Sequence, residues 1–248
     1  MRTGTRDVNL ANWPVAILAG GLATRLRPAT EKMPKALLNV AGEPFLGHQL
    51  RLLHSQGFRK IVLCVGYLGE MIEETIGDGK RFGVQIDYSF DGPTLLGTGG
   101  GVKRAIPKLG EHFVVVYGDS YMPADYAAIV DAFLRSEKMA LMTVFENEGR
   151  WDASNIEFEA SEILRYDKKL RTPKMRHIDY GISVLTAGVF GDFPDNAPFD
   201  LANLYSRLVA EKLVAAYEVK QRFYEIGSAQ GLAELDSLLR NQSVSLPA

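Results

Sequence analysis

Short apolar runs alternate with helical patterns through the first half of the chain. Four of these runs are typical of buried strands: 15–19, 61–65, 84–88 and 113–117. Between the first two, residues 45–55 place apolar side chains at helical spacing, and Gly57 suits a C-terminal cap. Further helical patterns cover 67–76, 102–109 and 123–136. Strands separated by helices predict an α/β fold whose mostly parallel sheet is joined by right-handed crossovers.

The second half is richer in strands. The apolar pattern predicts strands at 139–145, 155–158, 163–166, 178–185, 215–219 and 223–226, and helices at 201–213 and 229–239. We therefore expect a mixed sheet flanked by helices, with a small strand-rich insertion. The polar residues 1–12 are expected to form a disordered extension, 13–240 a single domain, and 241–248 a frayed end.

Composition limits the possible partners. The net charge is −2, so no global basic field attracts nucleic acid. No apolar run reaches the roughly 18 residues that a membrane helix needs, and residues 1–12 lack the apolar core of a signal peptide. The single cysteine, Cys64, lies in a predicted strand and cannot form a disulfide within the chain. These features predict a soluble cytoplasmic protein with neither nucleic acid nor membrane as partner.

The segment 19–28, AGGLATRLRP, follows the first apolar run and is suited to a polyphosphate. Gly20 and Gly21 let the backbone approach a ligand closely, and successive N–H groups can then face anionic oxygens. Arg25 adds a planar fork matched to phosphate, and Lys35 adds a second cation on the same connection. The alternative is a solvated basic surface. Neither the G-x-G-x-x-G fingerprint nor a Walker A motif is present.

Two carboxylates also follow predicted strands. Asp119 comes after an apolar run that ends in Gly118, and Glu225 precedes a glycine and a helix. Ligands of open parallel sheets bind beyond the carboxyl ends of the strands, where Mg²⁺ is usually held by one or two carboxylates and substrate phosphates. We therefore expect Asp119 and Glu225 to hold Mg²⁺. The alternative for each is a helix cap or a surface charge.

The glycine-rich segment 97–101 is poorly suited to a helix interior, so we expect a loop that approaches a nucleobase or ribose. A merely flexible turn is the alternative. The histidines show no metal-binding spacing: His48, His54, His112 and His177. No Ser/His/Asp or Cys/His arrangement is visible either.

Together these motifs resemble the sugar-1-phosphate nucleotidylyltransferase family. Its signature G-G-x-G-T-R-L-x-P-x-T, followed by P-K-x-L and G-x-P, is similar to 20–30, 34–37 and 42–44 of this chain. The likeness continues in the same order through Val65-Gly66-Tyr67, 96–100, Gly118-Asp119, Asp167-Lys168, 178–185 and 225–228. The resemblance implies the Rossmann-like fold of nucleotide-diphospho-sugar transferases.

The resemblance also implies roles for individual residues. The nucleotide would be held by Ala19, Gly20, Gly21, Thr24, Gly97, Thr98 and Gly99. The catalytic cations would be Arg25 on the β- and γ-phosphates, Lys35 by the α-phosphate and Lys168 on the sugar phosphate. The sugar substrate would contact Tyr67, Asn155, Asp167 and Asp179, and the metal would be held by Asp119 and Glu225.

The chain departs from the family pattern at three positions. Ala23 stands where the signature has glycine, so that turn must accommodate a Cβ atom. Asp167 is shorter than the usual Glu, and Glu225 is longer than the usual Asp. These substitutions alter the expected sugar contact and the expected metal geometry.

The family resemblance implies transfer of a nucleotidyl group from an NTP to a sugar 1-phosphate, with Mg²⁺, forming an NDP-sugar and pyrophosphate. The 96–100 loop most resembles that of guanylyltransferases acting on heptose or mannose 1-phosphate. The alternatives are a uridylyltransferase for an amino-sugar phosphate, a small cytidylyltransferase, and a catalytically silent nucleotide-sugar-binding regulatory protein. A homo-oligomer is compatible with each.

Overall fold

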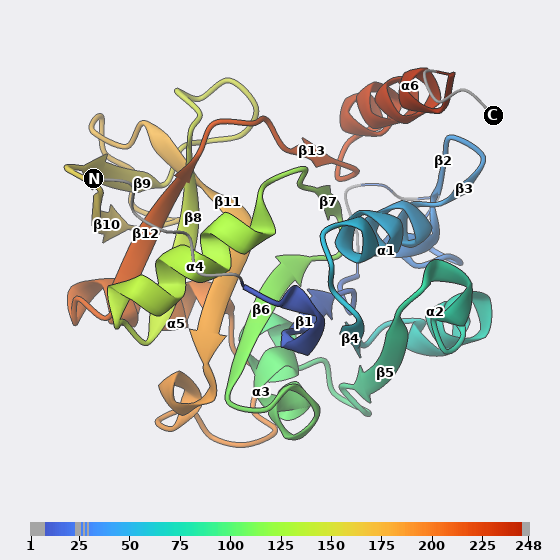
Figure 1. The fold of residues 1–248 in the computed structure, drawn as a ribbon, viewed down its shortest axis with the longest axis horizontal. Helices are drawn as coiled ribbons and strands as arrows, with labels where there is room; N and C mark the ends of the chain where they lie inside the picture. Colours follow the sequence, from blue (N-terminus) through green and yellow to red (C-terminus); the bar gives the residue numbers. More distant parts are fainter. Residues whose placement is uncertain (1–7, 23–25, 27, 29, 245–248) are drawn as a thin grey trace.

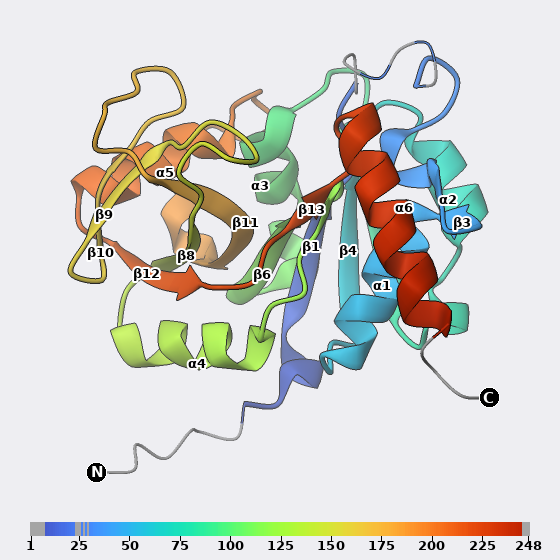
Figure 2. The same cartoon turned by 90° about the horizontal axis from the view of Figure 1, so that it is seen from above.

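The computed structural model describes residues 8–22, 26, 28 and 30–244. These residues form a mixed nine-stranded sheet with helices on both faces (Figures 1 and 2). The parallel part consists of β1 (Pro14–Leu18), β4 (Lys60–Val65), β5 (Gln85–Phe90) and β6 (His112–Tyr117). β1 pairs in parallel with both β4 and β6, and β4 pairs with β5. The predicted α/β class with a mostly parallel, mixed sheet is confirmed.

The strand-rich insertion extends this same sheet. Its strands are β8 (Ala140–Glu146), β9 (Ile156–Glu159), β10 (Glu162–Tyr166), β11 (His177–Thr186) and β12 (Val214–Val219). β11 joins the two halves, since it pairs antiparallel with β6 on one side and with β8 on the other. Two small ladders lie apart: β2 (Asn39–Val40) with β3 (Glu43–Pro44), and β7 (Ser120–Tyr121) with β13 (Tyr224–Glu225).

Helices cover both faces of the sheet, which explains why its central strands are continuously apolar. α1 (Phe45–Ser55), α2 (Gly69–Ile76) and α4 (Tyr126–Ser136) contribute to the core on one face. α3 (Gly97–Leu109) and α5 (Leu201–Ala210) form the core on the other (Figure 2). Within β1 the side chains alternate accordingly, because Val15 and Ile17 belong to the first core and Ala16 to the second. α6 (Ala229–Val244) packs with β2 and β13 in a third, smaller cluster. No helix in the described part of the chain is both long enough and apolar enough to cross a bilayer.

Most predicted elements lie within a few residues of the observed ones. At the N-terminal end, Leu10–Asn12 forms a 3-10 helix whose Leu10 is buried in the core, and Val8 packs against the same core. At the other end, α6 continues to Val244. The remainder of the predicted extension 1–12 and of the predicted frayed end 241–248 lies outside the described residues.

The prediction of a loop at 97–101 is wrong, because these residues form the start of α3. The lack of side chains at its glycines serves packing against the segment that precedes α5. A Cβ on Gly99 would lie 2.2 Å from the Phe199 ring, and one on Gly100 would lie 2.6 Å from the Ala197 carbonyl. Gly97 has a φ of +69°, with the Phe199 carbonyl 2.8 Å from the place of its missing Cβ. Close approach therefore outweighs the poor helix propensity of glycine here.

A matched pair of substitutions in α3 tests this account. Gly99→Ala should lower the free energy of unfolding by about 1–3 kcal/mol, because the Phe199 ring, stacked on Phe193 at 4.2 Å, must move. Gly101→Ala should leave stability unchanged or raise it by about 0.5–1 kcal/mol, since its Cβ meets only an ordinary 3.4 Å contact with Asp91. Urea unfolding measures both values. Equal losses in the two variants would contradict the packing explanation.

Candidate functional site

A cavity of about 460 Å³ opens beyond the carboxyl ends of β1, β4 and β6. These strands are parallel and in register, with Leu18 beside both Cys64 and Tyr117, so the residues after them meet at one edge. The predicted first connection lies here, because Ala19, Gly20 and Gly21 line the cavity. Thr24 and Arg25, and with them the irregular Ala23, lie outside the described residues.

Glycine allows these strand ends to approach one another. A Cβ on Gly20 would lie 2.9 Å from the Gly66 nitrogen, and one on Gly118 would lie 2.6 Å from the Leu18 carbonyl. The contacts are closed by hydrogen bonds, since the Gly118 N–H donates to the Leu18 carbonyl at 2.9 Å. Gly20 and Gly118 therefore expose backbone to the cavity where the strand ends meet.

Lys35 and Asp119 form the charged centre of the cavity. The Lys35 Nζ lies 2.7 Å from the Asp119 Oδ2, and both residues line the cavity. The amine is 14% exposed and the carboxylate 40%, so a ligand can reach the pair from the open side. Gln49 of α1 fixes the turn that carries Asp119 by donating to the backbone oxygens of Tyr117 and Ser120, at 2.8 and 3.0 Å.

Glu225 lies next to this pair through the β7–β13 ladder. Glu225 pairs with Ser120, and the Ile226 N–H donates to the Asp119 carbonyl at 3.0 Å. The Glu225 carboxylate accepts hydrogen bonds from the Gly227 N–H and the Ser228 hydroxyl. A Cβ on Gly227 would lie 2.1 Å from the Glu225 Oε2 and 3.1 Å from the Lys35 amine, so the absence of a side chain there lets the Glu225 carboxylate lie close to the amine. The structure thus brings the two predicted metal ligands together, and it also gives Glu225 the capping contacts of the alternative.

Thr98 and Gly97 line the other end of the cavity. The Thr98 hydroxyl donates to the Asp200 Oδ1 at 3.1 Å and accepts from the Leu201 N–H at 2.9 Å. Gly99 faces Phe199, and it is not among the residues that line the cavity.

A second group of predicted residues gathers on the strand-rich side. The Asn155 Oδ1 accepts from the Asp179 N–H at 3.1 Å. Burial raises the pKa of Asp179, and the nearby Lys168 ammonium counteracts this effect. The Lys168 amine lies 5.9 Å from the centre of the Tyr117 ring, which itself lines the cavity. Lys168, Asn155 and Asp179 are therefore connected to one another and, through Tyr117, to the cavity, although none of the three lines it, and their roles toward the sugar stay predictions.

Two other predicted sugar contacts make different interactions. The Tyr67 hydroxyl donates to the Glu31 carbonyl at 2.9 Å. The Asp167 carboxylate accepts from the Leu170 and Lys169 N–H groups, which lower its pKa. Asp167 thus closes a turn, and a role toward the sugar stays a prediction for both residues.

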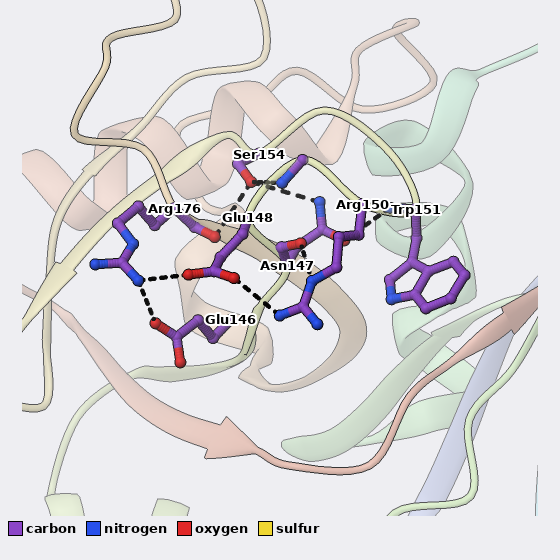
Figure 3. A network of polar contacts seen from close by, with 8 residues as sticks. Glu146, Asn147, Glu148, Arg150, Trp151, Ser154 and Arg176 are labelled. Carbon is purple, nitrogen blue, oxygen red and sulfur yellow. Dashed lines mark hydrogen bonds and ion pairs between the residues drawn. The ribbon is translucent and has the colours of Figure 1, made fainter.

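A loop between β8 and β9 connects this side to the segment that bears Glu225. Asn147, Ser154 and Arg176 hold the loop through the hydrogen-bond network in Figure 3. From the loop, the centre of the Trp151 ring lies 3.5 Å from the Arg222 guanidinium carbon. This cation–π contact ties the loop to the chain just before β13.

Comparison with known proteins agrees with this geometry. A model of the nucleotidyl transferase family matches residues 15–193. The chain belongs to this family. It is 44% identical to N-acetylmuramate alpha-1-phosphate uridylyltransferase of Neisseria meningitidis over 113 residues. These aligned residues cover 45% of this chain and 49% of that protein. It is also 30% identical to D-glycero-alpha-D-manno-heptose 1-phosphate guanylyltransferase of Campylobacter jejuni over 178 residues. That alignment covers 71% of this chain and 77% of that protein.

Solved structures share the fold of this chain. HddC from Yersinia pseudotuberculosis, complexed with GMP-PN, superposes with a TM-score of 0.75 at 23% identity, over 92% of this chain and 99% of that one. The chain spans about half the length of several of the relatives it matches, between 49% and 54%. The predicted family and fold are both confirmed.

Sequence reasoning missed three titratable residues that line the cavity: Cys64, Asp91 and Tyr117. Asp91 is 7% exposed, and its Oδ2 accepts from the Leu96 N–H at 3.0 Å. Burial raises the pKa of Asp91 and, to about 12, that of Cys64. Asp91 directly follows β5, so the rule that pointed to Asp119 would also have found it.

The raised pKa of Asp91 predicts a pH-dependent gain from Asp91→Asn. The amide oxygen of the variant can still accept the hydrogen bond from the Leu96 N–H, and the substitution removes a charge that burial desolvates. A carboxyl whose pKa is raised by folding favours the folded state most at low pH and loses that contribution as pH rises through the folded value. Asp91→Asn should therefore gain stability over the wild type as the pH rises from 4 to 7 in urea unfolding. If the free energy of unfolding of Asp91→Asn instead fell relative to that of the wild type over this pH range, the raised pKa of Asp91 would be contradicted.

Proposed function

We propose that this protein transfers a nucleotidyl group from an NTP to a sugar 1-phosphate and releases pyrophosphate. The observation that carries the proposal is the Lys35–Asp119 pair, 2.7 Å apart, in a cavity that is also lined by the backbone of Gly20, Gly21 and Gly118. Backbone N–H groups and a cation suit a polyphosphate, and an adjacent carboxylate suits its metal ion. The strand-rich side then holds the sugar.

The reaction needs position and charge rather than a protein nucleophile. A phosphate oxygen of the sugar 1-phosphate is already an anion at neutral pH, so it attacks the α-phosphorus in line without a general base. The bond from the α-phosphorus to the bridging oxygen breaks, and pyrophosphate leaves with the electron pair. Lys35 neutralises charge at the α-phosphate, and Lys168 holds the sugar phosphate beside it. This account explains why the buried Cys64 takes no part.

The residues present fit Mg²⁺. Asp119 directly precedes β7 and Glu225 lies in its partner β13, so both offer carboxylate oxygens on the same side of this ladder, and the Glu225 carboxylate occupies the space left by the missing Gly227 side chain. Among the described residues, no group of three or more His, Cys, Asp or Glu side chains is placed to hold a metal ion. Such a pair matches the usual Mg²⁺ site, which relies on substrate phosphates for its remaining ligands. When bound, the ion would neutralise the phosphate oxygens on which charge develops.

Asp91 supports guanine as the base. The Watson–Crick edge of guanine presents two adjacent donors, N1–H and N2–H₂, which a carboxylate can accept together. Asp91 has one oxygen bonded to Leu96, while the other lies 3.4 Å from the place of a Gly101 Cβ at the cavity wall. Uracil offers a single N–H between two carbonyl oxygens, and a carboxylate repels those oxygens. Carboxylate recognition therefore favours GTP over UTP.

The sugar side supports an uncharged sugar. Besides burial, the charges of Asp179 and Asp200 both raise the pKa of Tyr166, so both carboxylates act on this region. The charge of Lys168 lowers the pKa of Asp179. If Lys168 pairs with the substrate phosphate, the two carboxylates repel any further anionic group on the sugar. A heptose or mannose 1-phosphate fits this condition better than a carboxylate-bearing amino sugar.

A pyrophosphate-release assay with four NTPs and a panel of sugar 1-phosphates tests the proposed function. We expect GTP with mannose or heptose 1-phosphate to give the highest kcat/KM. Faster turnover of UTP with an amino-sugar phosphate would favour the alternative uridylyltransferase. Folded protein that turns over no pair in the presence of Mg²⁺ would leave only the silent regulatory reading.

Removing the charge of Asp119 should stop turnover while preserving the fold. We expect Asp119→Asn to lower kcat by about 10²–10³-fold, since stabilisation of developing charge is lost. Asp195→Asn is the matched control, because that carboxylate is 83% exposed and lies outside the cavity lining. Circular dichroism checks the folding of both variants. Wild-type kcat in Asp119→Asn would remove Asp119 from the site.

A further inference from the structure

Arg222 lies between two aromatic rings, just before the strand that carries Glu225. Its guanidinium carbon is 3.5 Å from the centre of the Trp151 ring and 4.7 Å from the centre of the Tyr224 ring. The guanidinium also pairs with the Glu234 carboxylate, and 30% of the Arg222 side chain is exposed. Its Nε is buried and has no hydrogen-bond partner in the described part of the chain. Two ring faces and one carboxylate therefore hold this cation.

These contacts join three separate parts of the fold. Trp151 belongs to the loop between β8 and β9, Tyr224 to β13, and Glu234 to α6. The Trp151 N–H donates to the Asn147 Oδ1 at 3.2 Å, and in Figure 3 the ring points away from the polar network of the loop. The ring is 44% exposed, and it belongs to none of the three apolar clusters that the described residues form. Its main contact is therefore the one with Arg222.

The parts that Arg222 joins also surround Glu225. Tyr224 precedes Glu225 in β13, and side chains alternate along a strand, so holding the Tyr224 ring on one face holds the Glu225 carboxylate on the other. From α6, the Ser228 hydroxyl donates to the Glu225 Oε1 at 2.8 Å and accepts from the Gly231 N–H at 3.0 Å. The first turn of α6, which Arg222 ties to β13, therefore fixes the carboxylate.

A small displacement of Glu225 would alter the proposed metal site. The Glu225 Oε2 lies 2.1 Å, and the Lys35 amine 3.1 Å, from the place of a Gly227 Cβ. The Asp119 Oδ2 lies 2.7 Å from the same amine. The three charged groups thus converge, and the separation of the two carboxylates determines whether they can share one ion. Mg²⁺ demands near-ideal geometry with oxygen ligands at about 2.0–2.1 Å, so the position of β13 is critical.

We propose that Arg222 and Trp151 position Glu225 for the metal ion. A loop of the strand-rich insertion would then stabilise the opposite, metal-binding side of the cavity. Neither residue is among those that line the cavity, so both act through Glu225 rather than on a substrate. Arg222 holds β13 and α6 together around Glu225, and Trp151 keeps Arg222 in that place. This inference rests on the proposed function, because it assumes that Glu225 binds the ion.

The kinetic test uses Arg222→Gln and Trp151→Leu. Each should lower kcat about tenfold at saturating NTP and raise the Mg²⁺ concentration for half-maximal rate by a similar factor, because Glu225 loses its support. KM for the sugar 1-phosphate should keep its wild-type value, since the proposed sugar contacts include neither residue. Trp151→Phe keeps an aromatic face for the cation and should restore most of the wild-type rate.

Arg240→Gln is the matched control. Arg240 also pairs with a carboxylate of α6, that of Asp236, at 2.6 Å, but both of these partners lie on the helix itself. Its removal should leave kcat and the Mg²⁺ dependence at their wild-type values. If Arg240→Gln changed the Mg²⁺ dependence as much as Arg222→Gln did, the effect would come from a general weakening of α6, and the inference would be overturned.

Hydrogen exchange tests the positioning without any turnover. In Arg222→Gln and Trp151→Leu, the amides of 224–228 should lose part of their protection, including the Ile226 N–H that donates to the Asp119 carbonyl at 3.0 Å. Exchange in α3, which is remote from these contacts, should stay as in the wild type.

The two measurements separate the possible failures. Wild-type Mg²⁺ dependence in both variants, in protein that turns over, would overturn the inference and leave the proposed function intact. Faster exchange at 224–228 would then show that Arg222 and Trp151 have a structural role only. Wild-type protein that turns over no pair of substrates would overturn the proposed function and, with it, the metal role of Glu225.

Discussion

The ion pair between Lys35 and Asp119 is the interaction on which the site depends. It joins the connection after β1 to the end of β6, two segments separated by 84 residues. The backbone of Asp119 in turn accepts from Ile226, which brings the β13 segment and Glu225 alongside. One contact therefore aligns the cation expected at the α-phosphate with the carboxylates expected at the metal.

The surrounding fold holds this contact in place mainly through shape. Gly20 and Gly118 let three strand ends converge, and Gln49 from α1 fixes the turn that carries Asp119. The parallel strands are buried on both faces, so their register is set by two separate apolar cores. The proposed catalysis by position and charge requires this rigidity, because it uses no protein nucleophile.

The sequence allowed the general architecture and the centre of the site to be predicted, because both depend on local patterns. α1 was predicted with its observed bounds, since apolar spacing and a terminal glycine agreed. Asp119 was found because a carboxylate after a buried strand has a known position in a parallel sheet. The glycines of 97–101 were misjudged because their reason is long-range, the packing of Phe199 and Ala197 against α3. Tyr117 was missed for a similar reason, since only the tertiary structure shows that it lines the cavity.

The central claim is that one cavity holds both substrates and that the nucleotidyl group passes directly between them. Isotope exchange between labelled pyrophosphate and the NTP tests this most directly, measured with and without the sugar 1-phosphate. Direct transfer predicts that label enters the NTP only when the sugar 1-phosphate is present. Exchange at the same rate without any sugar would show a covalent nucleotidyl-protein intermediate and would contradict the account.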